Sequence, residues 1–321
     1  MLSLSRTAPR LATRCRTSTS STAAAAARPF LPTLTTTTTT TQPSKPRFYS
    51  SATSSLPEFS LKDKVLVVSG GGRGLGLVQA EALLEAGARE VHAIDRLTSP
   101  SDDFARVADK FSSSSSGGGG GSALQYHRID VRESEALNGA VEAIAERHGR
   151  IDGLVAAAGV QQATPALEYN QEDSDRMLGI NVTGVFMTAQ AVARQMVRLG
   201  QGGSIALIAS MSGTIANKGL LCPVYNASKA AVIQLGRNLA AEWGQHGIRV
   251  NTISPGYIVT AMTEDLFKEH PEFRTNWTKE NMLGRLSVPE EYRGAAVFLL
   301  SDASSFMTGS DLRIDGGHAA W

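Results

Sequence analysis

The chain has 321 residues, and its 42% hydrophobic content is sufficient for a globular core. No apolar run approaches the roughly 18 residues that a membrane-spanning helix needs, so no membrane partner is expected. The formal net charge is +1, and no basic patch of the kind that binds nucleic acid is evident, so no nucleic-acid partner is expected either.

The first 55 residues differ in composition from the rest of the chain. They are rich in Ser, Thr and Ala, lack acidic residues, and carry Arg6, Arg10, Arg14, Arg16, Arg28, Lys45 and Arg47. This composition is typical of a mitochondrial transit peptide, and "RFYSSATSS" (47–55) resembles a matrix-processing site. We therefore expect residues 1–55 to be a disordered segment that targets the mitochondrial matrix. A merely disordered tail on a cytoplasmic protein is the alternative.

From residue 64 onward, short β-branched segments alternate with helical ones. Strands are predicted at 64–70, 90–95, 124–131, 151–159, 203–210, 248–256 and 311–315, and helices at 76–88, 101–111, 134–149, 173–200, around 224–243 and at 289–303. Such alternation produces a parallel sheet with helices on both faces. The sequence predicts one α/β domain over residues 56–321, doubly wound in the Rossmann manner, with a mostly parallel seven-stranded sheet. The Ser/Gly run at 112–122 is predicted as a flexible loop.

The glycine-rich segment "VVSGGGRGLG" lies between the first strand and the first helix. Gly70, Gly74 and Gly76 allow a tight turn and a close backbone approach to a pyrophosphate, and the helix N-terminus that follows offers free N–H groups. Arg73 and Leu75 lie in the same loop. A tight strand-to-helix turn without a ligand is the alternative, but the strand before and the helix after favour a dinucleotide site.

Asp95 ends the second predicted strand, where a carboxylate can accept hydrogen bonds from the adenosine ribose. A carboxylate there repels the 2′-phosphate of NADP, so Asp95 favours NAD as the cofactor. Arg73 and Arg96 favour NADP, which stays the alternative. Asp130, followed by Val131, ends the third strand and is either an adenine contact or an ordinary polar strand end.

Tyr225 and Lys229 lie four residues apart in "VYNASKAAV", so both side chains point to the same side of the predicted helix. Free tyrosine has a pKa of about 10 and releases its proton reluctantly at neutral pH. We expect a neighbouring ammonium, together with the positive charge of an oxidised nicotinamide, to lower the pKa of the phenol toward about 7. An isolated lysine at this place would instead extend its amine to solvent.

Four motifs in order resemble the short-chain dehydrogenase/reductase family from about Lys62 to the C-terminus. They are the glycine loop, Asn181 in "NVTG" with Ser210 in "IASMSG", the Tyr225/Lys229 pair, and "SPGYIVT". The resemblance implies that Tyr225 is the acid and base, and that Lys229 holds the nicotinamide ribose. It further implies that Ser210 binds the substrate oxygen and that Asn181 positions a water. Ser212 is the rival to Ser210.

The resemblance also implies further cofactor contacts. Ala157 and Gly159 lie where the family has Asn-Asn-Ala-Gly, which reads Ala-Ala-Ala-Gly here and lacks the bracing amides. Ile258 and Thr260 correspond to the nicotinamide contacts of the family. Tyr225 and Lys229 are expected to contact the cofactor as well.

The segment 257–288 is expected to be the substrate lid, because it is polar and lacks a long apolar wall for a steroid or an acyl chain. The C-terminal half resembles fungal polyol dehydrogenases and ketose reductases, of the D-arabinitol, mannitol and L-xylulose type. A small polyol or ketose is therefore the expected substrate. A 3-oxoacyl thioester reductase and a non-catalytic NAD-binding protein are the alternatives. The resemblance implies a homotetramer, and no metal site is expected.

Overall fold

The computed structural model describes residues 56–112 and 123–321, which belong to one compact unit. The predicted transit peptide (1–55) and residues 113–122 of the predicted flexible loop lie outside the described residues. Within the described ranges, no helix is both long and apolar enough to cross a bilayer.

The centre of the domain is a seven-stranded sheet in which every pairing is parallel. Its strands are β1 (Val65–Ser69), β2 (Glu90–Asp95), β3 (Leu124–Arg128), β4 (Gly153–Ala156), β5 (Gly203–Ile208), β6 (Ile248–Pro255) and β7 (Asp311–Ile314). The order β3-β2-β1-β4-β5-β6-β7 confirms the predicted doubly wound α/β fold. Strands β2 and β3 lie on one side of β1, and β4 to β7 lie on the other side, so the strand order reverses between β1 and β4. Ligands of such folds bind at the carboxyl ends of the strands at that point.

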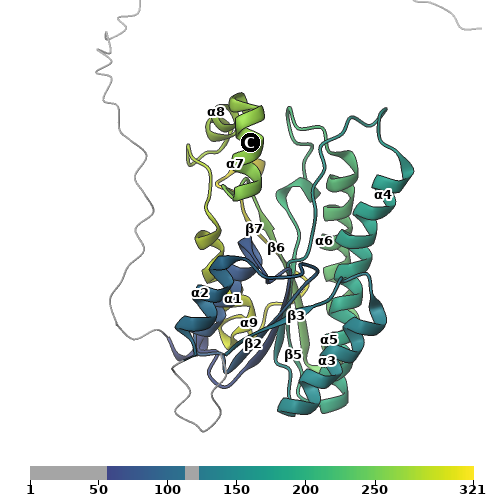
Figure 1. Ribbon diagram of the computed structural model, residues 1–321, viewed down its shortest axis with the longest axis vertical. Coiled ribbons are helices and arrows are strands. Elements are labelled where there is room, and N and C mark those ends of the chain that lie inside the picture. Colours follow the sequence, from purple (N-terminus) through teal and green to yellow (C-terminus); the bar gives the residue numbers. More distant parts are fainter. Residues whose placement is uncertain (1–55, 113–122) are drawn as a thin grey trace, which may run out of the picture. The chain divides into compact units, whose positions relative to one another are not determined.

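Helices cover both faces of the sheet (Figure 1). They are α1 (Gly74–Glu85), α2 (Asp102–Lys110), α3 (Ser134–His148), α5 (Val185–Leu199), α6 (Pro223–Trp243) and α9 (Arg293–Leu300). Alternate residues of β1 serve the two faces: Val65 and Val67 pack with α3, α5 and α6, whereas Leu66 and Val68 pack with α1, α2 and α9. All four side chains are fully buried, as expected for a parallel strand between two helical layers.

The long helix predicted at 173–200 is interrupted. It consists of α4 (Gln171–Leu178), a π-helical turn over Gly179–Gly184, and α5. A π-turn widens the backbone by one residue and is frequent at functional sites. It contains Asn181, whose side chain is fully buried. The remaining short turns are 3₁₀ helices at Pro57–Phe59, Met211–Gly213, Gly244–His246, Pro289–Tyr292, Asp302–Ser304 and His318–Ala320.

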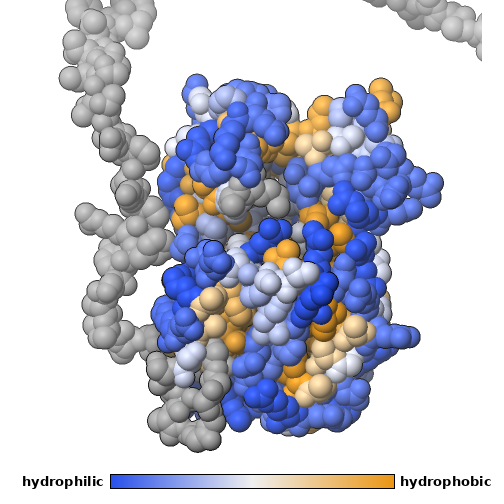
Figure 2. Space-filling model, viewed as in Figure 1, coloured by the Kyte–Doolittle hydropathy of each residue, from blue (hydrophilic) through white to orange (hydrophobic). Residues whose placement is uncertain are grey.

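The segment predicted as a lid forms two helices, α7 (Ala261–Glu269) and α8 (Pro271–Glu280). Its aromatic rings pack on one another: Tyr257 stacks on Trp277 at 3.8 Å between ring centroids, and Phe273 stacks on the same indole at 5.1 Å. Trp277 is 2% exposed, so its aromatic surface is buried by the packing of this segment. Hydrophilic residues predominate on the outside of α7 and α8 (Figure 2).

Candidate active site

The glycine loop brings bare backbone to the carboxyl end of β1. A side-chain carbon added at Gly70, whose φ is 69°, would lie 2.8 Å from the backbone nitrogen of Ala158, and one added at Gly76 would collide with the carbonyl oxygen of Gly70. Helix α1 begins directly after Arg73, which offers no side-chain cap. The first N–H groups of the helix are therefore free to bind an anion, as the pyrophosphate of a dinucleotide requires.

Gly76→Ala tests how closely this loop is packed. Its methyl group would meet a backbone carbonyl that cannot turn away, so we expect a loss of about 1–3 kcal/mol in the free energy of unfolding and weaker dinucleotide binding. Gly74→Ala is the matched control, because an added carbon there meets nothing within 4 Å and carries only the strain of its φ of 55°. Urea denaturation and fluorescence titration with NAD measure both effects. Equal destabilisation by the two variants would contradict the packing argument.

Asp95 closes the loop from the neighbouring strand. Its carboxylate accepts a hydrogen bond from the backbone N–H of Gly72 at 3.1 Å, a contact that the sequence analysis did not identify. Arg73 and Arg96 have exposed side chains at the same edge. An acidic side chain thus lies at the rim of the loop, with two cations free to move beside it.

Asp130 and Val131 lie after β3. Asp130 forms a salt bridge with Arg132 at 2.7 Å, and this hydrogen-bonded partner lowers the pKa of the Asp130 carboxyl. Val131 is 5% exposed and faces the π-turn, where a side-chain carbon added at Gly184 would collide with it. The structure therefore places Asp130 in a surface ion pair and Val131 in the packing beside Asn181.

The predicted catalytic side chains converge where α6 meets the end of β5. The hydroxyl of Ser210 lies near enough to the phenol of Tyr225 to lower its pKa, and it accepts a hydrogen bond from the backbone N–H of Ser212 at 3.1 Å. Lys229 is 5% exposed, and its Nζ donates to the carbonyl oxygen of Ile208 at 2.9 Å. The same Nζ lies 5.7 Å from the centre of the Tyr225 ring. Ser210 is thus the serine whose hydroxyl meets the phenol.

Asn181 is held by a complete set of hydrogen bonds. Its amide nitrogen donates to the carbonyl oxygen of Val160 at 2.9 Å and to the hydroxyl of Ser228 at 3.0 Å, and its amide oxygen accepts from the N–H of Val160 at 2.9 Å. The side chain therefore fastens α6 and the π-turn to the loop after β4.

Burial sets the pKa values of the two reactive groups. It raises the pKa of Tyr225 to about 12, against a smaller lowering by the hydrogen bond from Ser210. Burial likewise lowers the pKa of Lys229 to about 8. In the chain alone, desolvation of the phenol is the largest effect, so the expected lowering toward about 7 stays a prediction for the protein with its nicotinamide bound. Any net lowering must come from a charge that a ligand brings.

The loop after β4 is braced despite its missing amides. The hydroxyl of Ser69, at the end of β1, accepts a weak bond from the N–H of Ala158 at 3.4 Å, and the carbonyl of Ser69 accepts from Ala157 at 3.0 Å. Gly159 then passes close to the reactive groups: a side-chain carbon added there would lie 3.5 Å from Nζ of Lys229 and 3.4 Å from the amide oxygen of Asn181. The backbone of 157–159 thus lines the crevice, as expected.

Ile258 and Thr260 follow β6 and lead into the lid. Ile258 forms an isolated parallel bridge with Ser287, which ties the two ends of the lid together. Thr260 caps α7 by accepting a hydrogen bond from the N–H of Thr263 at 3.3 Å. Both residues therefore fix where the lid begins.

Comparison with known proteins assigns the chain to a family. The family profile described as enoyl-(acyl carrier protein) reductase matches residues 70–319. A ribulose-forming D-arabinitol 2-dehydrogenase of Candida albicans is 37% identical over 278 residues, covering 85% of this chain and 99% of that protein. The short-chain dehydrogenase/reductase notP' of Aspergillus versicolor is 39% identical over 272 residues, with 82% and 89% covered.

A solved structure agrees with these relatives. The gluconate 5-dehydrogenase of Burkholderia cenocepacia J2315, in complex with NADP and tartrate, superposes with a TM-score of 0.73 at 33% identity, covering 82% of this chain and 98% of that one. The matched proteins carry out oxidation and reduction at alcohol groups, and the match includes the glycine loop and the Tyr225/Lys229 pair. The chain is therefore an oxidoreductase of the short-chain dehydrogenase/reductase family, acting on alcohol groups.

Proposed function

We propose that the protein interconverts a five- or six-carbon sugar alcohol and its 2-ketose, with D-arabinitol and ribulose as the leading pair. The observation that carries the proposal is the position of Lys229 beside Tyr225 and the backbone of Gly159: its Nζ lies 5.7 Å from the centre of the Tyr225 ring and donates to the Ile208 carbonyl oxygen at 2.9 Å. A bound nicotinamide cofactor supplies the hydride acceptor or donor. The relatives that act on D-arabinitol, galactitol and gluconate support the substrate class.

Each reactive group has a role that follows from its contacts. The Tyr225 hydroxyl gives its proton to the ketose oxygen in reduction and takes the alcohol proton in oxidation. Ser210, near the same hydroxyl, is placed to bind the substrate oxygen. The hydrogen bond from Lys229 to the Ile208 carbonyl holds the amine beside the Tyr225 ring. The hydrogen bonds of Asn181 fix the segments around the catalytic side chains relative to one another. Gly70, Gly74 and Gly76 leave room for the pyrophosphate.

A cavity of about 330 Å³ lies between the turn after β5, the end of α8 and the C-terminal residues. Its lining residues are Ile215, Ala216, Lys218, Glu280, His318, Ala319 and Trp321. Asn226, the neighbour of Tyr225, donates a hydrogen bond to the Ile215 carbonyl at 3.0 Å, which joins the cavity wall to the catalytic helix. A wall that mixes a cation, a carboxylate and an imidazole suits a ligand with many hydroxyl groups.

NAD is the proposed cofactor, with NADP as the alternative. The support is Asp95, whose carboxylate is fixed at the loop by Gly72, where it would repel a 2′-phosphate. The solved gluconate 5-dehydrogenase holds NADP, so relatives alone do not decide the choice. The ratio of kcat/KM with NAD to that with NADP decides it, and we expect NAD to be preferred at least about 10-fold, the equivalent of one lost or unfavourable contact of about 1.4 kcal/mol.

The substrate proposal is tested by a panel assay with the purified full-length protein. Absorbance of the reduced cofactor is followed with D-arabinitol, mannitol, sorbitol and galactitol, and in reverse with ribulose and fructose. We expect turnover with at least one polyol–ketose pair. Turnover of acetoacetyl thioesters alone would select the 3-oxoacyl thioester reductase. Tight NAD binding without turnover of any compound would select the non-catalytic alternative.

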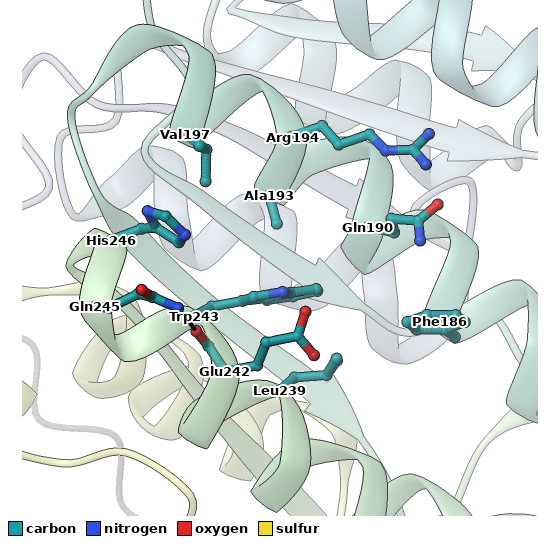
Figure 3. Close-up of a pocket in the computed structure, with 10 residues that line it drawn as sticks. All are labelled: Phe186, Gln190, Ala193, Arg194, Val197, Leu239, Glu242, Trp243, Gln245 and His246. Atoms are coloured by element: carbon teal, nitrogen blue, oxygen red, sulfur yellow. Dashed lines mark hydrogen bonds between the residues drawn. The ribbon is translucent and has the colours of Figure 1, made fainter.

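We further propose a homotetramer and import into the mitochondrial matrix. The support for assembly is the outer face of α5 and α6, where a cavity of about 360 Å³ opens between Phe186, Arg194, Leu239 and Trp243 (Figure 3). The apolar side chains of 230–243 are largely used in the core of the subunit itself, as Val232, Ile233 and Leu239 are buried. Light scattering measures the mass of the assembly and tests the homotetramer.

Support for import into the mitochondrial matrix is the composition of residues 1–55. Fluorescence microscopy tests whether the protein reaches the mitochondrial matrix.

A further inference from the structure

A buried cluster of imidazoles lies at the opposite end of the sheet from the glycine loop. Glu90 and His92 lie on β2, near its amino end, whereas Asp95 marks the carboxyl end of the same strand. His148 is the last residue of α3, and His127 lies on β3. Residues 90 and 92 share one face of the strand because side chains alternate, and the end of α3 covers that face. The sequence analysis expected no metal site, since these residues are far apart along the chain.

The distances within the cluster match a coordination site. Nε2 of His92 lies 3.3 Å from Nε2 of His148, and each of these nitrogens lies 3.6 Å from a carboxylate oxygen of Glu90. Two ligand atoms bound tetrahedrally to zinc, each about 2.1 Å from the ion, lie about 3.4 Å apart. Oε1 of Glu90 is the oxygen near His92 and Oε2 the one near His148, and one ligand atom from each of the three side chains lies within 4.8 Å of the other two, close enough for the three to share one ion.

The hydrogen-bond donors and acceptors of the cluster favour a bound cation over a network of hydrogen bonds. Nδ1 of His92 lies 3.0 Å from Nε2 of His127, so His92 can donate there and keep a lone pair on Nε2. The Glu90 oxygen Oε1 is buried without a hydrogen-bond partner. Glu90 is 9% exposed and His92 1% exposed, so water is a poor substitute. Unpaired buried acceptors are costly unless a cation meets them.

The charge around Glu90 agrees with a bound cation. The nearest fixed cation to Glu90 is Arg147, which is 63% exposed and lies 3.8 Å from Oε1, too far for a hydrogen bond.

We propose that Glu90, His92 and His148 bind one divalent transition-metal ion of the zinc class, with His127 orienting His92 through its Nδ1–H. Two imidazoles and one carboxylate suit zinc or cobalt and not magnesium, which prefers oxygen ligands. The bound ion joins the end of α3 to β2 and stabilises the fold. It lies at the far end of the sheet from Tyr225, so it takes no part in the hydrogen transfer.

The test uses the untagged full-length protein, stripped with a chelator and then titrated with zinc against a chromophoric competitor. We expect one zinc ion per chain, a rise in the melting temperature with zinc but not with magnesium, and a visible tetrahedral absorption band with cobalt. Turnover at saturating cofactor is expected to be the same with and without zinc.

Variants separate the site from adventitious binding. His148→Gln and Glu90→Gln are expected to weaken zinc binding at least about 100-fold, and His127→Gln about 10–100-fold, since it only orients a ligand. His246→Gln, at an exposed histidine in the turn after α6, is the control and is expected to bind zinc like the parent. Melting curves of the stripped variants show whether each one folds. Zinc binding that is absent in the parent, or equally tight in folded His148→Gln, would overturn the proposal.

Discussion

Tyr225→Phe is expected to reduce kcat by about 10²–10⁴-fold while leaving dinucleotide affinity nearly unchanged. The variant removes the hydroxyl near Ser210 and keeps the ring beside Lys229. Stopped-flow and steady-state kinetics with a polyol and its ketose measure the loss. Tyr169→Phe is the matched control, because the Tyr169 hydroxyl is buried without a hydrogen-bond partner and its removal costs little. A Tyr225→Phe enzyme with more than a tenth of parental kcat would contradict the assigned role.

The raised pKa of Tyr225, about 12, also fixes the direction of the pH dependence. Ketose reduction needs the protonated phenol, which is present throughout the neutral range, so kcat/KM for reduction is expected to be flat from about pH 6 to 9. Polyol oxidation needs the phenolate, whose fraction rises about tenfold for each pH unit below the pKa. The logarithm of kcat/KM for oxidation is therefore expected to rise with a slope near 1, up to the pKa that applies once cofactor is bound. Tyr225→Phe is expected to abolish this slope.

Lys229→Met is expected to lower kcat/KM by about 10²–10³-fold, the usual cost of removing one group that stabilises developing negative charge. The same variant is expected to be more stable than the parent at pH 7. Burial lowers the pKa of Lys229 from 10.5 to about 8, which corresponds to roughly 3 kcal/mol of desolvation cost while the amine is charged. The lost hydrogen bond to the Ile208 carbonyl offsets about 1.5 kcal/mol, leaving a gain of about 1–2 kcal/mol.

The pH dependence of the stability difference between Lys229→Met and the parent distinguishes the removal of a buried charge from a simple change in packing. Below pH 8 both the folded and the unfolded parent carry the proton, so the cost is fully present. Between pH 8 and 10.5 the folded protein releases the proton first, and the parent gains stability as the pH rises. The advantage of Lys229→Met in urea denaturation is therefore expected to shrink over this range. An advantage that is independent of pH would show that burial of charge is not its cause.

The sequence was sufficient for those parts of the site in which residue type and spacing dictate the geometry. Gly70, Gly74 and Gly76 between a strand and a helix predict a bare backbone turn, and the spacing of Tyr225 and Lys229 predicts a shared helix face. In the structure the loop is indeed too close-packed for side chains at Gly70 and Gly76, and both reactive groups line one crevice. The parallel sheet followed equally directly from the alternation of strands and helices.

Other features depend on contacts that no local pattern encodes. The π-turn at Asn181 arises inside a segment whose periodicity predicts an uninterrupted helix, because the buried amide bonds to Val160 and Ser228 on other elements. The pKa of Tyr225 is governed by how much water the assembled crevice excludes, which spacing does not report. Glu90, His92 and His148 meet only because α3 ends over the start of β2.

The stacking of Tyr257 on Trp277 links regions that are remote in sequence. His318 meets the Tyr257 ring edge-on at 5.1 Å, and its Nδ1 donates a hydrogen bond to the amide oxygen of Asn281 at 2.9 Å. The Trp321 indole donates to the Glu280 carbonyl at 2.7 Å. Helix α8 therefore cannot swing outward without breaking these bonds or carrying the last four residues with it. The position of α8 thus depends on side chains from the last few residues of the described chain.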